Sequence, residues 1–259
     1  MWINRSKIKL SFNNHQIKKF SRQLILKDFG EEKQNLILKS HITFVGMGGI
    51  NIPALLYLLA IGLNKLTIVD YDKVQLSNLN RQIIYSVKDV GKYKVRCVSN
   101  YLKKNYPDVN FLSLNKEINK NNCSKILKKT DVVIDGTDNW DSMLTINENC
   151  VKKNIPLLSA SVLGYDGNLT LFKNNRKKHI CLECIFPNPK KIELPRCETA
   201  GILGTTSGII GTLAAVKAIE YLTNNKNSPK STKMIFFNGK KIELKSIKIN
   251  NNPKCRLIK

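Results

Sequence analysis

Short apolar runs separated by amphipathic stretches recur along the first two thirds of this sequence. Runs such as His41–Val45 and Leu66–Val69 have the length of buried strands, and segments with helical spacing of apolar residues follow them. Strands that alternate with helices are typical of a mostly parallel, doubly wound sheet. The strands expected in this part are His41–Val45, Leu66–Val69, Val109–Leu114, Asp131–Asp135 and Pro156–Ser161.

Helical spacing predicts what connects these strands. Residues 12–38 should form two short helices broken near Gly30, and a further helix should stop before Pro107, which cannot continue it. The helices expected after residue 38 are Pro53–Gly62, Lys88–Tyr106 (the one that stops before Pro107), a polar helix up to Thr130, and Trp140–Asn154.

The pattern changes from Asp166 onward. A short strand, Gly167–Phe172, precedes a connection at 187–200 that we expect to be long and exposed. A helix rich in small residues should follow at Gly201–Thr223, and then a hairpin of Lys233–Phe237 and Ile242–Ile249. Asn238-Gly239 favours this hairpin because its residues suit a left-handed turn. We therefore predict a Rossmann-like, doubly wound mixed α/β sheet, with a parallel N-terminal half and antiparallel C-terminal strands.

A glycine turn, Gly46-Met47-Gly48-Gly49, lies between the first expected strand and helix. Such glycines let backbone N–H groups approach phosphate oxygens at a helix start, or simply let helix and strand pack closely. Asp70 ends the second strand 21 residues after Gly49, about where such folds place a carboxylate that holds ribose hydroxyls. Asn51 occupies the third glycine position of a dinucleotide fingerprint, which counts against NAD.

Composition narrows the classes of protein. The 259 residues, 42% of them hydrophobic, suffice for one α/β domain or one and a half. The net charge of +24 is spread over the chain without basic blocks interleaved with aromatics, so we expect no nucleic-acid partner. Residues 1–20 lack an apolar signal core, and the segment Gly201–Leu222 is too polar for a membrane span. Seven cysteines without a secretion signal indicate reduced thiols and a cytoplasmic protein.

Further polar motifs follow the glycine turn in a fixed order. The full set, in chain order, is Arg22-Gln23, Gly46-Met47-Gly48-Gly49, Asp70-x-Asp72, Ser77-Asn78-Leu79-Asn80-Arg81-Gln82, Lys94, Thr137-Asp138-Asn139, Cys181-x-x-Cys184 and Cys197-Glu198-Thr199-Ala200-Gly201. From about residue 12 to the C-terminus, this set resembles the ThiF/MoeB/HesA family. Its members are E1-like enzymes that adenylylate the C-terminus of ubiquitin-like sulfur-carrier proteins.

The resemblance implies an ATP- and Mg²⁺-dependent adenylyltransferase. Its substrate would be the C-terminal Gly-Gly of a ThiS- or MoaD-like carrier, activated for sulfur transfer in thiamine or molybdopterin cofactor biosynthesis. It also implies a homodimer and one adenylation domain over residues 1–259, in which 12–165 bind nucleotide and 166–259 hold the carrier and a candidate zinc site. We expect no rhodanese-like extension after Lys259.

The resemblance also assigns residues, position by position. The nucleotide-binding positions are Gly46, Gly48, Gly49, Asp70, Asp72, Ser77, Asn78, Arg81, Lys94, Asp138 and Asn139. The catalytic positions are Arg22, Asn78, Arg81, Lys94, Asp138 and Cys197. Asp138 would bind Mg²⁺, although an aspartate just before a helix can also be its N-cap. Arg22 would enter the active site of the dimer partner.

The cysteines fall into groups. Cys181 and Cys184 have the spacing of half a zinc site, and Cys255 fits the first position of the family's second pair. Ile258 replaces the fourth cysteine, so His179 or a water would complete the site, unless the site is lost. Cys197 matches the cysteine with which some family members bind their carrier covalently. We expect the remaining thiols to be buried: Cys97, Cys123 and Cys150.

Other functions share parts of this pattern. An NAD-dependent oxidoreductase has the same kind of sheet, but Asn51 and the set Asn78, Arg81 and Lys94 argue against it. A non-catalytic or nucleic-acid-binding relative would account for the charge. An E1-like enzyme acting on a tRNA base or a peptide would share the motifs.

Overall fold

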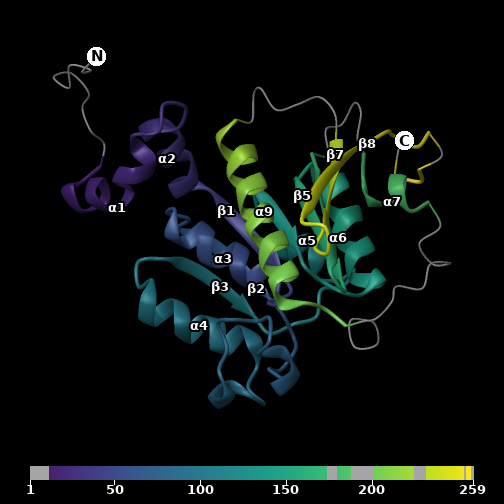
Figure 1. Cartoon of the computed structure of the whole chain (residues 1–259), viewed down its shortest axis with the longest axis horizontal. Helices are drawn as coiled ribbons and strands as arrows, with labels where there is room; N and C mark the ends of the chain where they lie inside the picture. Colours follow the sequence, from purple (N-terminus) through teal and green to yellow (C-terminus); the bar gives the residue numbers. More distant parts are fainter. Residues whose placement is uncertain (1–11, 174–179, 188–200, 225–231, 254, 258–259) are drawn as a thin grey trace.

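One sheet of eight strands runs through the residues that the computed structural model describes, which are 12–173, 180–187, 201–224, 232–253 and 255–257. Its strand order is β3-β2-β1-β4-β5-β6-β7-β8 (Figure 1). The strands are β1 (His41–Val45), β2 (Lys65–Val69), β3 (Asn110–Leu114), β4 (Val132–Asp135), β5 (Leu157–Leu163), β6 (Asp166–Phe172), β7 (Thr232–Asn238) and β8 (Glu243–Ile249). Neighbours are parallel from β3 to β5 and antiparallel from β5 to β8, which confirms the predicted mixed sheet.

Helices cover both faces of the sheet because alternate strand residues point to opposite sides. One apolar cluster joins α3, α4 and α9 to one face, and a second joins α5, α6 and α7 to the other. The helices are α1 (Asn14–Leu24), α2 (Gly30–Lys39), α3 (Asn51–Ala60), α4 (Lys94–Asn105), α5 (Cys123–Ile126), α6 (Trp140–Lys153), α7 (Leu182–Ile185) and α9 (Gly204–Thr223). Two short 3₁₀ turns, Leu76–Asn78 and Val87–Asp89, lie between β2 and α4.

The long helix α9 packs unusually close to α3. A Cβ at Gly211 would lie 2.2 Å from the carbonyl oxygen of Ile50, so only glycine allows this contact. Ile50 directly precedes α3. The contact therefore holds the amino-terminal half of α9 beside the turn that follows β1.

Two helix predictions were wrong in extent. The expected helix Lys88–Tyr106 begins only at Lys94, because Val87–Asp89 form a 3₁₀ turn and Gly91 has a φ of +85°. In that turn Ser86 and Asp89 bond to each other's side chains and backbone. The expected polar helix before Thr130 is only the four-residue α5.

The C-terminal hairpin was predicted correctly, but its turn was not. Asn238 pairs with Glu243, and the left-handed residue is Ile242 (φ 56°) rather than Gly239. Gly239 is required for space, since a Cβ there would lie 2.4 Å from the carbonyl oxygen of Tyr165.

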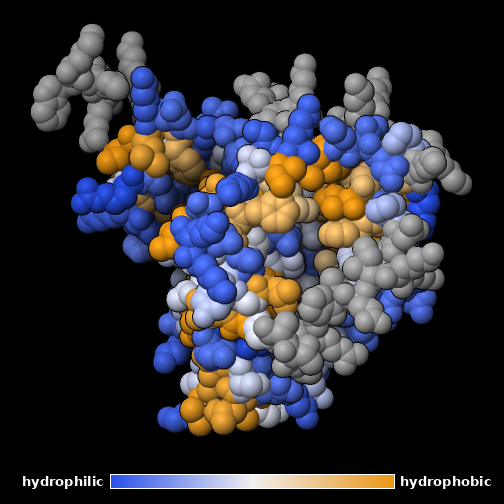
Figure 2. Space-filling view, turned by 45° about the vertical axis from the view of Figure 1, so that its right-hand side comes forward, coloured by the Kyte–Doolittle hydropathy of each residue, from blue (hydrophilic) through white to orange (hydrophobic). Residues whose placement is uncertain are grey.

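The face of the molecule in Figure 2 is mainly hydrophilic, with separate apolar patches. No helix in the described part of the chain has both the length and the apolar character needed to cross a bilayer. The connection expected at 187–200 lies, from residue 188 onward, outside the described residues.

Candidate active site

The carboxyl ends of β1 and β4 lie side by side where the chain changes direction across the sheet. From β1 the chain adds β2 and β3 on one side, and then returns to place β4 on the other. Gly136, after β4, donates its N–H to the carbonyl of Val45 at 3.0 Å. Doubly wound sheets bind their ligands in the crevice at such a switch point.

The glycine turn after β1 fits tightly between its neighbours. Gly46 has a φ of +82°, and a Cβ there would lie 3.0 Å from the carbonyl oxygen of Gly136. A Cβ at Gly49 would lie 3.1 Å from Arg81 Cγ and 3.1 Å from Ser207 Cβ of α9. Close packing thus explains these two glycines. At Gly48 the nearest described atom would be the Gln82 amide nitrogen at 3.8 Å, which leaves the backbone there open to a ligand.

Asp70 holds the glycine turn against the end of β2. One of its carboxylate oxygens accepts the N–H of Met47 at 2.6 Å, and the other accepts the N–H of Asp72 at 2.7 Å. Burial raises the pKa of Asp70, and the nearby charge of Lys94 opposes that shift. Each carboxylate oxygen keeps a second lone pair, so the group could still accept a hydrogen bond from a ligand hydroxyl.

Lys94 and Asp72 form an ion pair beside this carboxylate. Lys94 is the first residue of α4, and its ammonium lies 2.8 Å from Asp72 Oδ2. The Lys94 side chain is 8% exposed, whereas that of Asp72 is 49% exposed. A buried ammonium requires an anionic partner. A polyphosphate that entered the crevice could compete with Asp72 for this cation.

Arg81 lies on the other side of the glycine turn. Its guanidinium donates to the carbonyl of Ser77 at 2.9 Å and to Asn80 Oδ1 at 3.0 Å. Asn78 is buried, and its Oδ1 accepts the N–H of Gln75 at 3.1 Å. These bonds hold Arg81 against the 3₁₀ turn Leu76–Asn78 that precedes it. Both bonds of the guanidinium use the same nitrogen, which leaves its other N–H groups for an anion.

Asp138 does not cap α6. The N-cap is Asn139, whose side chain accepts the N–H of Ser142 at 2.8 Å, while Asp138 is exposed. The structure therefore removes the alternative structural role for Asp138. It also gives Asn139 the role of a helix cap, in addition to the nucleotide-binding role that the resemblance implies.

Asp135, three residues before Asp138 in the sequence, was not among the expected site residues. It is 1% exposed, and its Oδ1 accepts both the N–H of Thr137 at 3.0 Å and its hydroxyl at 2.7 Å. Burial raises the pKa of Asp135 to about 6. Like Asp70, it is an aspartate at the carboxyl end of a strand, and this was the sequence signal that could have revealed it. Gln82, the last residue of the motif that begins at Ser77, and Ser207 also border the glycine turn; Ser207 had no comparable signal.

Arg22 does not meet these residues within its own chain. It is exposed on α1, and the neighbouring Gln23 binds the carbonyl of Ile61 at 3.0 Å. Ile61 follows the end of α3, whereas the glycine turn precedes its start. A ten-residue helix is about 15 Å long, so α1 is anchored about that distance from the turn.

The structure brings three of the expected zinc ligands together. Cys181 Sγ lies 3.9 Å from Cys184 Sγ and 3.7 Å from Cys255 Sγ. A tetrahedral zinc site with Zn–S bonds of about 2.3 Å has sulfur–sulfur edges of about 3.8 Å. A hydrogen bond from Cys181 lowers the pKa of Cys184. His179, Cys197 and Ile258 lie outside the described residues.

Arg256 links the C-terminal segment, which carries Cys255, to α7, which carries Cys184. Its guanidinium forms two hydrogen bonds with the buried Glu183, at 2.6 and 2.9 Å, and a third with Glu148 of α6 at 3.3 Å. Cys97, Cys123 and Cys150 are buried, as expected.

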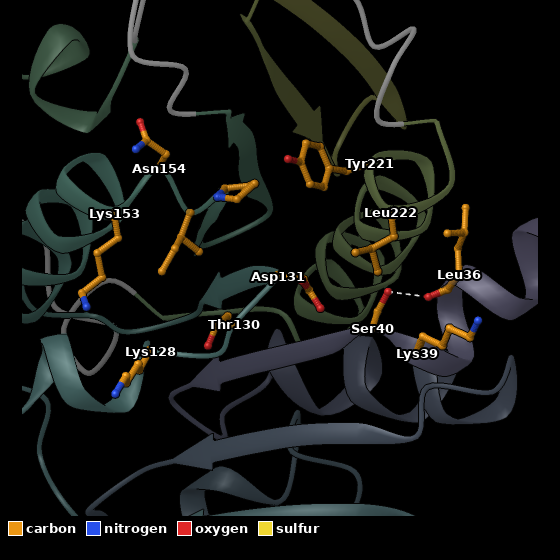
Figure 3. A pocket seen from close by; sticks show the side chains of 12 residues that line it. Leu36, Lys39, Ser40, Lys128, Thr130, Asp131, Lys153, Asn154, Tyr221 and Leu222 are labelled. Carbon is orange, nitrogen blue, oxygen red and sulfur yellow. Dashed lines mark hydrogen bonds between the residues drawn. The ribbon is translucent and has the colours of Figure 1, made fainter.

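A separate cavity of about 680 Å³ lies at the amino-terminal ends of the strands, on the side of the sheet away from the glycine turn. Figure 3 shows Lys39, Lys128 and Lys153 around it, with Asp131 and Tyr221. Asp131 directly precedes β4, so the cavity faces the amino ends of the strands. None of the expected nucleotide-binding residues lines it, and we do not place the active site there.

A topological switch point whose strand ends carry a glycine turn, cations and carboxylates is the place where doubly wound α/β folds bind nucleotides. The chain belongs to the ThiF family, whose model matches residues 20–257.

Known proteins agree with this assignment. The "Adenylyltransferase and sulfurtransferase MOCS3" of Aedes aegypti is 33% identical over 238 residues, which are 92% of this chain and 54% of that protein. The chain thus spans about half the length of such curated relatives. The "SAMP-activating enzyme E1" of Haloferax volcanii is 30% identical over 247 residues, 95% of this chain and 90% of that protein. The crystal structure of Escherichia coli MccB with ATP shares the fold, with 19% identity and a TM-score of 0.74 over 88% of this chain and 69% of that chain.

Proposed function

We propose that this protein adenylylates the C-terminal glycine of a ubiquitin-like sulfur carrier, ThiS- or MoaD-like, with ATP. The carrier would then serve sulfur transfer in thiamine or molybdopterin cofactor biosynthesis. Membership of the ThiF family and the similarity to relatives named adenylyltransferase and E1 support this activity. The observation that carries it is the arrangement at the glycine turn. Arg81 packs against Gly49, Asp70 beside Lys94 bonds to Met47, and Gly136, two residues before Asp138, packs against Gly46.

The chemistry requires this combination of groups. A carboxylate of the carrier attacks the α-phosphorus of ATP, and pyrophosphate leaves. Both reactants are anionic, so cations must offset their repulsion and hold them in line. In our proposal Lys94 leaves Asp72 and binds the phosphates, together with Arg81 and Asn78. The backbone at Gly48 approaches the phosphates, and Asp70 holds the ribose hydroxyls.

Asp138 is proposed to hold Mg²⁺. Its carboxylate is exposed and caps no helix, and one carboxylate together with phosphate oxygens is a donor set that Mg²⁺ prefers. A bound Mg²⁺ neutralises part of the triphosphate charge. Asp138 itself would orient the phosphates toward the carrier.

The thiol cluster is proposed to bind zinc as a structural crosslink. Three thiolates at tetrahedral spacing supply three ligands, and His179 or a water would be the fourth. We expect about one zinc per chain in the purified protein, lost in the variant Cys181→Ser. Metal-free wild-type protein with full stability would exclude this role.

We further propose a homodimer in which Arg22 enters the partner's active site. Ile25 and Leu26, which directly follow α1, are 65% and 56% exposed. A partner subunit would cover such apolar side chains. Cys197 is proposed to receive the activated carrier, a role that rests on the family resemblance alone.

ATP–pyrophosphate exchange tests the proposed function. We expect exchange only when both Mg²⁺ and a carrier ending in Gly-Gly are present, and thermal stabilisation by ATP but not by NAD. Stabilisation by NAD would indicate an oxidoreductase. Exchange that depends on a tRNA or a peptide instead of the carrier would redirect the proposal to that substrate.

A further inference from the structure

Asn51 stands where the dinucleotide fingerprint has its third glycine. It is the first residue of α3 and has no exposed surface. Its amide nitrogen lies 2.8 Å from the carbonyl oxygen of Val45, 2.7 Å from that of Gly46 and 3.3 Å from that of Ile134. A primary amide has two N–H groups, so two of these contacts are full hydrogen bonds and the third is shared.

The orientation of this amide is fixed by its surroundings. Rotating it by 180° would point its oxygen at three carbonyl oxygens, an arrangement without any donor. The nitrogen must therefore face the ends of β1 and β4. Val45 and Gly46 belong to the β1 side, which carries the glycine turn. Ile134 belongs to β4, whose end leads to Asp138.

Gly136 makes room for this amide. A Cβ at Gly136 would lie 3.1 Å from both the amide carbon and the amide nitrogen of Asn51. Asparagine at 51 and glycine at 136 are thus a complementary pair. The pair lies between the glycine turn and the Asp138 loop, the two parts of the crevice that have to meet at the same phosphates.

We infer that Asn51 is a positioning residue, which sets the glycine turn against the loop that carries Asp138. The inference rests on the proposed adenylylation. The three hydrogen-bond contacts of the Asn51 amide are all with backbone carbonyls, so its effect would pass through the positions of the turn and the loop. Because a shift of about 1 Å in a reacting group can slow a reaction about a hundredfold, loss of this bridge should slow the chemical step more than it weakens ATP binding.

The test compares four variants in pyrophosphate exchange, each measured well below its melting temperature. For Asn51→Gly we expect kcat to fall at least about tenfold and KM for ATP to change less than about threefold. Gly136→Ala should also lower kcat, because its methyl group presses on the amide. In the double variant Asn51→Gly/Gly136→Ala the alanine methyl group meets no amide. Its kcat should therefore be less than about twofold below that of Asn51→Gly alone. Ile37→Ala removes a buried side chain of α2 and controls for lost stability alone.

Hydrogen exchange provides a readout that does not depend on the carrier or on activity. We expect faster amide exchange in both 46–49 and 136–139 for Asn51→Gly, but not for Ile37→Ala. A folded Asn51→Gly protein whose amide hydrogen exchange in these segments equals that of the wild type would overturn the inference. So would a Gly136→Ala change that lowers kcat by the same factor with and without Asn51. Wild-type protein that lacks pyrophosphate exchange would instead contradict the proposed function, and the amide-exchange result would still decide the role of Asn51.

Discussion

Three strand ends in this protein are fixed by short polar side chains that bond to nearby backbone. Asp70, directly after β2, bonds to Met47 and Asp72, and Asp135, the last residue of β4, bonds to Thr137. Asn51 joins the ends of β1 and β4. These bonds occupy the side chains closest to the sheet, and Asp138 stays exposed beyond them. At the scale of residues, the bonds of Asp70, Asp135 and Asn51 support the strand ends, whereas Asp138, which is proposed to hold Mg²⁺, is exposed.

Asp138→Ala and Asn139→Ala should separate these two roles. Because Asp138 is exposed and caps no helix, its removal should lower pyrophosphate exchange at least about a hundredfold and leave stability unchanged. Asn139→Ala removes the cap of α6 and should lower the free energy of unfolding by about 1 kcal/mol. Rates and urea unfolding curves of both variants check this. Full exchange activity in Asp138→Ala would rule out its assigned role.

Asp135 should make stability depend on pH. Its folded-state pKa of about 6 lies above its unfolded value, so the folded state holds the proton more tightly. The stability from this group is complete below about pH 4 and is lost as the pH rises through about 6, by about 3 kcal/mol. We expect the unfolding free energy of the wild type to fall, relative to Asp135→Asn, across that window. Parallel pH profiles of the two proteins would contradict this account.

At the scale of elements, hydrophobic periodicity predicted the strands and most helices. It worked because buried strands and amphipathic helices carry their own pattern. It failed where local hydrogen bonds or neighbours decide, as at the 3₁₀ turn of Val87–Asp89 and the left-handed Ile242. The family motifs predict Lys94 and Arg81 as nucleotide-binding residues; in the structure Lys94 pairs with Asp72 beside Asp70, and Arg81 packs against Gly49. Asp135 and the bridging role of Asn51 depend on contacts between strands that no single segment reveals.

The hydrogen bonds of Arg256 with Glu183 and Glu148, which we call the Arg256 clamp, should contribute to the stability of the protein. Arg256→Ala leaves Glu183 buried without its partner, and we expect a loss of about 1–3 kcal/mol in unfolding free energy. Lys152→Ala is the matched control, since it breaks an exposed ion pair with Glu148 and should cost about 0–1 kcal/mol. Urea unfolding compares them. Equal losses in both variants would mean that the clamp adds nothing.

At the scale of the whole molecule, Arg22 lies away from the proposed active site of its own chain, although the family resemblance assigns it to such a site. Within its own chain, Arg22 is anchored at the far end of α3 from the glycine turn. A symmetric dimer would solve this, because each subunit would give to its partner the residue that it cannot bring to its own site.

Mixing two inactive variants tests that arrangement. Arg22→Ala and Asp138→Ala should each be inactive alone. After unfolding and refolding together, half of the dimers should be mixed, and one site in each should have both residues intact. The rate of ATP–pyrophosphate exchange should then return to about a quarter of the wild-type rate. No recovery in proteins shown to form mixed dimers would mean that Arg22 does not act across the interface.

The most direct test of the central claim follows the phosphorus atoms of ATP. The protein is incubated with Mg²⁺, a carrier ending in Gly-Gly, and ATP labelled at either the α- or the γ-phosphate. We predict that the α-label becomes attached to the carrier's terminal carboxylate and that the γ-label leaves in pyrophosphate. A carrier without its last glycine should take up neither. Release of the γ-label as inorganic phosphate, with no α-label on the carrier, would contradict adenylylation.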